Sequence, residues 1–443
     1  MKEAEDFIYA SYLKASSHIK GKKDEETRNI GLARRLFDAI GSPDKEQASI
    51  LVTGSKGKGS TSRLIASLLA HAGLKVGLFT SPHLVHFNER IRINGKAISD
   101  QDFIRLSNQI EPSARSIEST LEENEYQGPI GLALAIACLY FKEQATDINV
   151  IECGRGGAYD ETNILHNEWA VITPIMVEHA QYLGPTVEDI ARHKLGIIKP
   201  CTKHVYVSDQ KDNLNLIKTL MPENNGASCS FYNEHFSASD IASGQQGTTF
   251  TVETKQQTYE GLELPLLGSF QAINAATAIR ICEDIVKEAL DETLVRKCFR
   301  SIQWPGRMEL IAGSPPVVLD GAINKESARY VVQWLKTHQW KHIVSIIGVP
   351  SDKDYKGVIE ELAKISKKMI LTKPDITHLH FPADALLFAE TVAEQAIETE
   401  TLAAAVELAK QDKEAEAILI IGTQTLIANA KRLWNQTLDD IGL

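Results

Sequence analysis

Residues 49–80 read SILVTGSKGKGSTSRLIASLLAHAGLKVGLFT, and this stretch holds the pattern from which the fold class can be predicted. It opens with the apolar run 50–52, passes through a glycine-rich turn at 54–59, and continues with a helical pattern over 60–72. A second apolar run at 76–79 closes it. Strand, turn, helix and strand in this order predict a βαβ unit, which begins a parallel sheet.

Beyond this unit the alternation continues and extends the predicted sheet. Apolar, strand-like runs occupy residues 148–152 and 170–173, with a helical pattern over 130–141 before them. Residues 201–266 are richer in Ser, Asn, Gln and Thr and contain short alternating runs such as 205–207. We therefore predict an α/β domain with a P-loop, a doubly wound parallel sheet and a β-rich flank over 201–266.

A second alternation of predicted strands and helices follows a turn that ends the helical pattern. The helical spacing that covers 272–287 and the next segment stops at Trp304, and the turn-forming pair Pro305-Gly306 follows. We place the domain boundary there, with a P-loop domain over 1–303 and a smaller C-terminal Rossmann-like α/β domain over 304–443. The strands expected in the second domain cover 317–319, 343–347, 369–372 and 417–421.

Composition and charge limit the classes of function. With 443 residues, 43% of them hydrophobic, the chain is predicted to be globular and long enough for more than one core. Its net charge of −11 repels nucleic-acid phosphates, so we expect no nucleic-acid partner. We see no signal-peptide pattern and no apolar stretch as long as a membrane span, and we expect a cytoplasmic protein without a membrane partner. The six cysteines lack CxxC spacing and are interpreted as reduced thiols.

The glycine-rich turn predicts a phosphate site. Backbone amides and the positive end of a helix dipole converge where the strand ends and the helix begins. A lysine there reaches the outer phosphates, and a hydroxyl from Ser60 or Thr61 suits Mg²⁺. A glycine-rich turn without a ligand is the alternative, but it leaves the lysine and the two hydroxyls unexplained. The expected nucleotide-binding residues are Gly54, Gly57, Lys58, Gly59, Ser60 and Thr61.

Motifs along nearly the whole chain carry a family resemblance. They are G-x-x-G-K-G-S at 54–60, TSPHL at 80–84, NERIRING at 88–95, ECGRGG at 152–157 and HKLGIIKP at 193–200. Together they resemble the Mur ligase family, in its folylpolyglutamate synthase/dihydrofolate synthase branch. The resemblance implies a ligase that uses ATP to convert a carboxylate into an acyl phosphate and then joins it to an amine.

The resemblance also implies roles for individual residues. Its catalytic residues match Lys58, Lys194 and His179. Its Mg²⁺ ligands match Ser60, Ser81, Glu152, His179 and Lys194, the lysine after carbamylation. Further contacts to ATP match Asn274, Arg307 and Asp320.

Each of these side chains also has a purely structural interpretation. Glu152 follows an apolar run, where parallel-sheet sites form, but it could instead make a salt bridge at the sheet edge. A single histidine such as His179 is more often packed or capping than metal-bound. Lys194 could be an unmodified surface lysine, and Arg307 could form a salt bridge at the domain interface.

The residues that depart from the family pattern lie on the side of the acceptor and amino-acid substrates and not in the phosphate loop. The helix over 130–141 opens with Gly128-Pro129-Ile130-Gly131, where the folate enzymes usually have a Phe-Glu pair. Ala158 replaces the usual arginine, and Ile323 replaces a histidine. The segment GTQTL at 422–426 also differs from the family's Gly-Ser-x-Tyr-Leu.

Three hypotheses about function remain at this point. The first is glutamate addition to folate or dihydropteroate, and the second is a paralogue that joins a different carboxylate and amine. The third is a non-catalytic ATP-binding protein, which the retained set Lys58, Ser60, Glu152, His179 and Lys194 disfavours. We expect a monomer whose partners are a small-molecule carboxylate and an amino acid.

Overall fold

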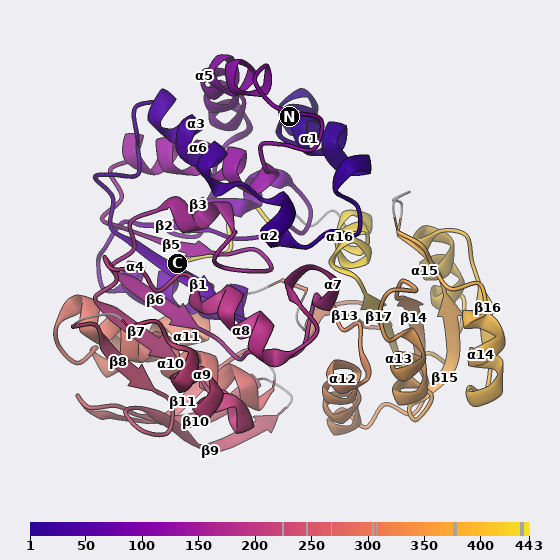
Figure 1. The fold of residues 1–443 in the computed structure, drawn as a ribbon. Coiled ribbons are helices and arrows are strands. Elements are labelled where there is room, and N and C mark those ends of the chain that lie inside the picture. Colours follow the sequence, from indigo (N-terminus) through magenta and orange to yellow (C-terminus); the bar gives the residue numbers. More distant parts are fainter. Residues whose placement is uncertain are drawn as a thin grey trace.

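The computed structural model describes residues 1–223, 226–244, 247–266, 268–303, 305–306, 308–374, 379–434 and 438–443. Within these ranges the strands form three sheets. Figure 1 shows the first two sheets in one body and the third beside them, with its own helices. The predicted phosphate loop belongs to the first sheet.

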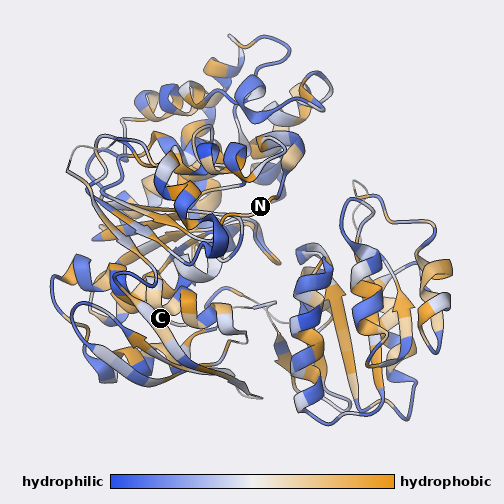
Figure 2. Ribbon diagram, turned by 60° about the horizontal axis from the view of Figure 1, so that its bottom comes forward, coloured by the Kyte–Doolittle hydropathy of each residue, from blue (hydrophilic) through white to orange (hydrophobic). Residues whose placement is uncertain are grey.

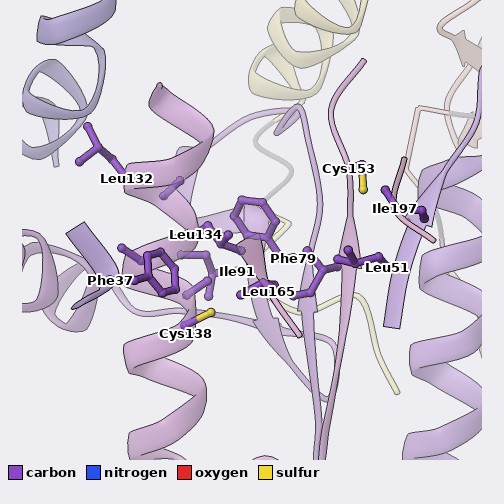
Figure 3. Close-up of a cluster of buried hydrophobic side chains, with 14 of the residues drawn as sticks. Phe37, Leu51, Phe79, Ile91, Leu132, Leu134, Cys138, Cys153, Leu165 and Ile197 are labelled. Atoms are coloured by element: carbon purple, nitrogen blue, oxygen red, sulfur yellow. The ribbon is translucent and has the colours of Figure 1, made fainter. Parts of the chain in front are cut away.

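The first sheet is mostly parallel and is buried on both faces. Across the sheet its strands are β4 (Lys96–Ala97), β3 (Ile91–Ile93), β2 (Val76–Phe79), β5 (Ile148–Glu152), β1 (Ser49–Thr53), β6 (Trp169–Ile172), β7 (His204–Val207) and β8 (Ser228–Phe231). β3 pairs antiparallel with both β2 and β4, and the remaining neighbours in the sheet pair parallel. Leu51 packs in one core with Phe79 and Cys153 (Figure 3), whereas Ile50 and Val52 pack in the other. Burial on both faces of the sheet explains why residues 50–52 of β1 form a continuous apolar run.

Helices cover both faces of this sheet. One face carries α1 (Lys2–Ile19), α3 (Ile30–Ala39), α5 (Asp100–Glu118), α6 (Pro129–Glu143), α8 (Val187–Leu195) and α9 (Leu214–Leu220). The other carries α4 (Lys58–His71), α10 (Ser269–Val286) and α11 (Glu292–Ser301). Shorter turns are α2 (Asp24–Thr27), α7 (Ala180–Leu183), η1 (Phe87–Arg90), η2 (Glu161–Ile164) and η3 (Lys211–Asn213). The doubly wound arrangement predicted from the sequence is confirmed.

The β-rich flank is smaller than predicted. Strands β9 (Ser237–Gly244), β10 (Gly247–Glu253) and β11 (Thr258–Leu264) form an antiparallel sheet that packs on α10. Residues 205–207, which the prediction places in the flank, belong instead to β7 of the first sheet. Their side chains are all buried, as in a parallel strand covered on both faces.

The third sheet is a second doubly wound unit. Across the sheet its strands are β12 (Glu309–Ile311), β13 (Val317–Asp320), β17 (Ala417–Gly422), β14 (Ile343–Gly348), β15 (Ser366–Leu371) and β16 (Ala396–Glu398). One face packs against α12 (Lys325–Thr337), α13 (Tyr355–Leu362) and α14 (Ala385–Val392), the other against α15 (Leu402–Lys410) and α16 (Gln424–Leu433). Figure 2 shows the apolar strands between these helices. Trp304, at the predicted boundary, lies outside the described residues.

Two further features of the described residues bear on the sequence analysis. No helix within the described ranges combines the length and the apolar character that crossing a bilayer requires. All six cysteines are free, as the spacing predicted, and Cys138, Cys153, Cys282 and Cys298 are buried.

Candidate active site

The phosphate loop joins β1 to α4 at the carboxyl edge of the first sheet. Gly57 caps α4 with a φ of 82°, and a Cβ there would lie 2.8 Å from Oδ1 of Asn274. A Cβ on Gly54, whose φ is 144°, would lie 1.9 Å from Oγ1 of Thr173. Both glycines therefore combine a positive φ with close packing that excludes a side chain. Asn274, predicted from the resemblance, lies directly against the loop.

Two lysines converge on the loop. The ammonium groups of Lys58 and Lys194 both donate to the carbonyl of Gly54, at 2.8 and 2.7 Å. Lys194 on α8 is fully buried and also donates to the carbonyl of Arg155 at 2.9 Å and to Glu178 at 3.1 Å. Burial and the charge of Lys58 lower the pKa of Lys194 to about 8, and Glu178 opposes the shift. The loop therefore faces two cations that an anionic ligand would stabilise.

Further oxygen-bearing side chains lie at the carboxyl edge of the same sheet and in the first turn of α4. Ser60 and Thr61 lie in the first turn of α4, and Oγ1 of Thr61 is buried without a hydrogen-bond partner among the described residues. At the ends of β5 and β2, the backbone N–H of Ser81 donates to Oε2 of Glu152 at 3.0 Å. Hydroxyl and carboxylate oxygens are the donors Mg²⁺ prefers, so Ser60, Ser81 and Glu152 fit that ion. The described part of the chain holds no group of three His, Cys, Asp or Glu suited to a metal.

His179 lies just beyond the end of β6, at the start of α7. Its φ is 49° and its side chain is exposed. Desolvation by nearby protein lowers the pKa of His179, Glu178 opposes this, and the charges of Lys353, Lys58 and Lys194 lower it further. A neutral imidazole is the form that binds a metal. Lys353 follows β14, and Figure 1 shows α7 on the side of the first body that faces the third sheet.

Asp320 lies at the carboxyl end of β13. Its carboxylate accepts hydrogen bonds from the backbone N–H of Met308 at 2.9 Å and of Ala322 at 2.8 Å. These bonds fix the chain where it enters the third sheet. Arg307, expected to contact ATP, lies outside the described residues.

The departures at Gly128 and Gly131 have a structural cause. A Cβ on Gly128 would lie 1.8 Å from Oε1 of Glu161, and one on Gly131 would lie 3.2 Å from its Cγ. Glu161 is buried and ion-paired with Arg28 at 3.6 Å. Its side chain fills the start of α6 and leaves no space for a side chain at Gly128.

Ala158 is likewise closely packed. A Cβ on Gly196 would lie 2.5 Å from the Cβ of Ala158. A Cβ on the preceding Gly157 would lie 2.6 Å from the carbonyl of His193. The 157–158 turn therefore packs closely against the end of α8, the helix that carries Lys194.

Several residues at the site were missed by the sequence analysis. They are Thr173, which packs on Gly54, Glu178, which pairs with Lys194, and Glu161. Glu178 could have been identified from the sequence, because it is an acid next to His179 in the segment that follows β6. Thr173 and Glu161 could not, since their role depends on contacts across the fold.

Comparisons with known proteins agree with this geometry. The family model of the Mur ligase middle domain matches residues 52–282, and that of the Mur ligase glutamate ligase domain matches residues 306–424. The chain belongs to the Mur ligase family. A dihydrofolate synthase/folylpolyglutamate synthase from Bacillus subtilis is 34% identical to this ligase, over 81% of the chain and 84% of the relative. The ligase therefore falls in the folylpolyglutamate synthase/dihydrofolate synthase branch, whose chemistry is ATP-dependent carbon–nitrogen bond formation.

Solved structures support the same placement. A Mycobacterium tuberculosis folylpolyglutamate synthase complexed with ADP and AMPPCP superposes with a TM-score of 0.85 at 26% identity, covering 93% of this ligase and 97% of that chain. An FPGS–AMPPCP–folate complex superposes with a TM-score of 0.78 at 26% identity, covering 96% and 100%. The predicted fold class and family are confirmed, and the fold is one that binds adenine nucleotides.

Proposed function

We propose that this ligase joins the amine of glutamate to a carboxylate of folate or dihydropteroate. The observation that carries the proposal is the convergence of Lys58, Lys194 and the glycine-rich loop at the carboxyl edge of the first sheet. The names of the relatives and the folate-bound structure supply the substrate class.

The chemistry requires two steps. A carboxylate oxygen of the acceptor attacks the γ-phosphorus of ATP, the bond to the bridging oxygen breaks, and ADP and an acyl phosphate form. The neutral amine of glutamate then attacks the acyl carbon and loses a proton, and phosphate leaves with the C–O bonding pair. Charge builds on phosphoryl oxygens in the first step, where cations and backbone amides stabilise it.

Individual residues are assigned roles in these steps. Lys58 contacts the outer phosphates after its ammonium leaves the Gly54 carbonyl, and Asn274 orders the loop from the far side of Gly57. Gly59 and Thr61 contribute backbone and hydroxyl groups to the same cradle. Asp320 contacts the nucleotide from the end of β13, and Arg307 contacts it as the family resemblance implies.

We also propose Mg²⁺ as the metal of this site. Ser60, Ser81, Glu152, His179 and carbamylated Lys194 would hold the ion. When bound, the ion neutralises phosphate charge. A pKa of about 8 leaves part of Lys194 as the neutral amine that reacts with carbon dioxide, and this supports the carbamylation.

A second candidate is a paralogue that uses another carboxylate. The start of α6 at Gly128 and Gly131, together with Ala158 and Ile323, favours it, since these residues replace groups of the family pattern. They leave the phosphate loop intact, so they alter which acceptor binds more than how ATP is used.

The test is phosphate release from ATP and Mg²⁺ with dihydropteroate or tetrahydrofolate plus L-glutamate, followed by mass spectrometry. We expect a product heavier by one glutamyl unit. The Lys58→Ala variant should lower its rate by at least about a hundredfold. ATP binding without turnover on either folate would reject the acceptor and favour the paralogue, whereas absence of ATP binding would reject both.

A further inference from the structure

The segment 438–443 leaves the third sheet and packs on the first. Figure 1 marks the C end of the chain among the strands of the first sheet, far from β14 and β15. The N–H of Ala97 donates to the carbonyl of Asp439 at 2.7 Å, and Lys96 and Asp440 form an antiparallel bridge. The segment thus extends the β3–β4 edge, with Leu438 and Ile441 buried.

Two buried arginines, Arg63 on α4 and Arg92 on β3, hold this segment. Nη2 of Arg63 donates to the carbonyls of Ile441 and Gly442, both at 2.8 Å, and Nη2 of Arg92 donates to that of Leu438 at 2.7 Å. Arg63 is 1% exposed and Arg92 is 4% exposed. Neither forms an ion pair with a carboxylate among the described residues, so backbone carbonyls of the segment are their main acceptors.

The position of Arg63 connects the segment to the phosphate loop. Arg63 lies on α4, five residues after Lys58 and three after Ser60. At a rise of about 1.5 Å per residue, its anchor is about 7–8 Å along the helix from Lys58. The segment therefore binds the helix that carries the candidate ATP and metal residues.

The other end of the segment follows the third sheet closely. The helix α16 ends at Leu433, and four residue steps from Trp434 to Leu438 span at most about 14 Å. Nη2 of Arg432 on α16 also donates to the carbonyl of Val85, in the loop after β2, at 2.8 Å. The third sheet is thus attached to the first at its exit as well as at its entry near Gly306.

We propose that residues 438–443 are a second tether, which acts through Arg63 and Arg92 to position the third sheet over the phosphate loop. With both ends of the third-sheet unit fixed, its movement is limited to a swing about the line that joins the two attachments. Such restriction raises the effective concentration of third-sheet residues at the acyl phosphate. The inference rests on the proposed ligation for its kinetic consequence, but not for the tether itself.

The test lengthens the tether while leaving its docking intact. A twelve-residue Gly-Ser insertion after Trp434 extends a connection of three residues to about fifteen, which lowers effective concentration about tenfold by the three-halves power of length. The matched control carries the same insertion between Lys255 and Gln256, an exposed hairpin turn of the flank. Ligation kinetics, ATP affinity, the melting temperature and small-angle scattering are measured on both.

We expect the Trp434 insertion to lower kcat/KM for ligation about tenfold. It should also broaden the scattering-derived size distribution, while the melting temperature matches that of the control. Unchanged kinetics, or an equal loss in both variants, would overturn the positioning role. An unchanged scattering curve would overturn the tether.

A second variant tests the anchor residues. Arg63→Met should lower the melting temperature and weaken ligation, because it removes the main donor to the segment, and Arg63→Lys should restore part of both. If the unmodified chain ligates no glutamate, the substrate proposal fails. The scattering comparison still decides whether the segment restricts the third sheet.

Discussion

At the level of single residues, the phosphate loop depends on glycines that combine two requirements. Gly57 has a φ of 82° and packs against Asn274, whereas Gly73, with a φ of 94°, has no atom within 4 Å of the position that a Cβ would take. An alanine at either position adopts the left-handed region, which costs about 1–2 kcal/mol. Only at Gly57 does the new methyl group also displace a residue of the site.

We therefore predict that Gly73→Ala lowers the free energy of unfolding by about 1–2 kcal/mol, and that Gly57→Ala lowers it by more, because its methyl group also displaces Asn274. Gly57→Ala should in addition weaken ATP binding by more than about tenfold, because the loop amides lose their alignment. Urea unfolding and ATP titration calorimetry check this. Equal ATP affinities in the two variants would contradict the proposed role of the loop.

Glu161 is a second residue whose environment makes a prediction. Burial raises the pKa of Glu161, and the charge of Arg28 opposes the shift. The folded state therefore keeps the Glu161 carboxyl protonated at a pH where the unfolded state has released the proton. Stability falls as pH rises from about 4.3 through the raised pKa. Glu161→Gln should reduce this decline, seen as a smaller difference between urea midpoints near about pH 5 and about pH 8. An unchanged difference would show that Glu161 is ionised throughout.

At the level of secondary-structure elements, the loop between β2 and η1 is shaped by one carboxylate. Glu89 accepts hydrogen bonds from the backbone N–H groups of Leu84, Val85 and His86, at 3.0, 2.9 and 2.7 Å. This loop contains Ser81, a proposed metal ligand. Bonds from amides to a carboxylate are among the stronger hydrogen bonds in proteins.

Glu89→Ala should destabilise the protein by about 2–3 kcal/mol and lower ligation more than ATP binding, because the loop carrying Ser81 loses its support. The control is Glu111→Ala on α5, which removes an exposed i,i+4 pair with Arg115. It should cost less than about 0.5 kcal/mol. Thermal unfolding and steady-state kinetics distinguish them, and similar effects from both would argue against the role of Glu89.

At the level of the entire protein, the two large sheets have separate cores. The third sheet buries its own clusters on both faces, while the first depends on the segment 438–443 to satisfy Arg63 and Arg92. A unit with its own core can fold alone. Without the segment, Arg63 would lose the carbonyls of Ile441 and Gly442, and Arg92 would lose that of Leu438 and keep that of Gly95, which is costly for these guanidinium groups.

We predict that a fragment of residues 306–434 unfolds cooperatively by itself. A fragment of residues 1–303 should melt well below the full chain, and a synthetic peptide of residues 438–443 should raise its melting temperature. Circular dichroism melts check both fragments. A non-cooperative melt of 306–434 would move the domain boundary away from the proposed position.

Local patterns in the sequence were enough to predict the βαβ unit, the phosphate loop and the family. An apolar run is buried wherever it lies, and glycines beside a lysine indicate a backbone that must approach phosphate. The sequence also indicated Glu152, since the end of an apolar strand identifies the edge of a parallel sheet.

Which distant residues meet could be learned only from the folded chain. The structure assigned 205–207 to the first sheet, placed Glu161 in the space that Gly128 leaves, joined Lys194 to the Gly54 carbonyl, and docked 438–443 on Arg63. These contacts join residues far apart in the chain, and no local pattern encodes their pairing. Their partners are fixed by packing, because a buried charge or polar group must find whatever acceptor the folded chain brings to it.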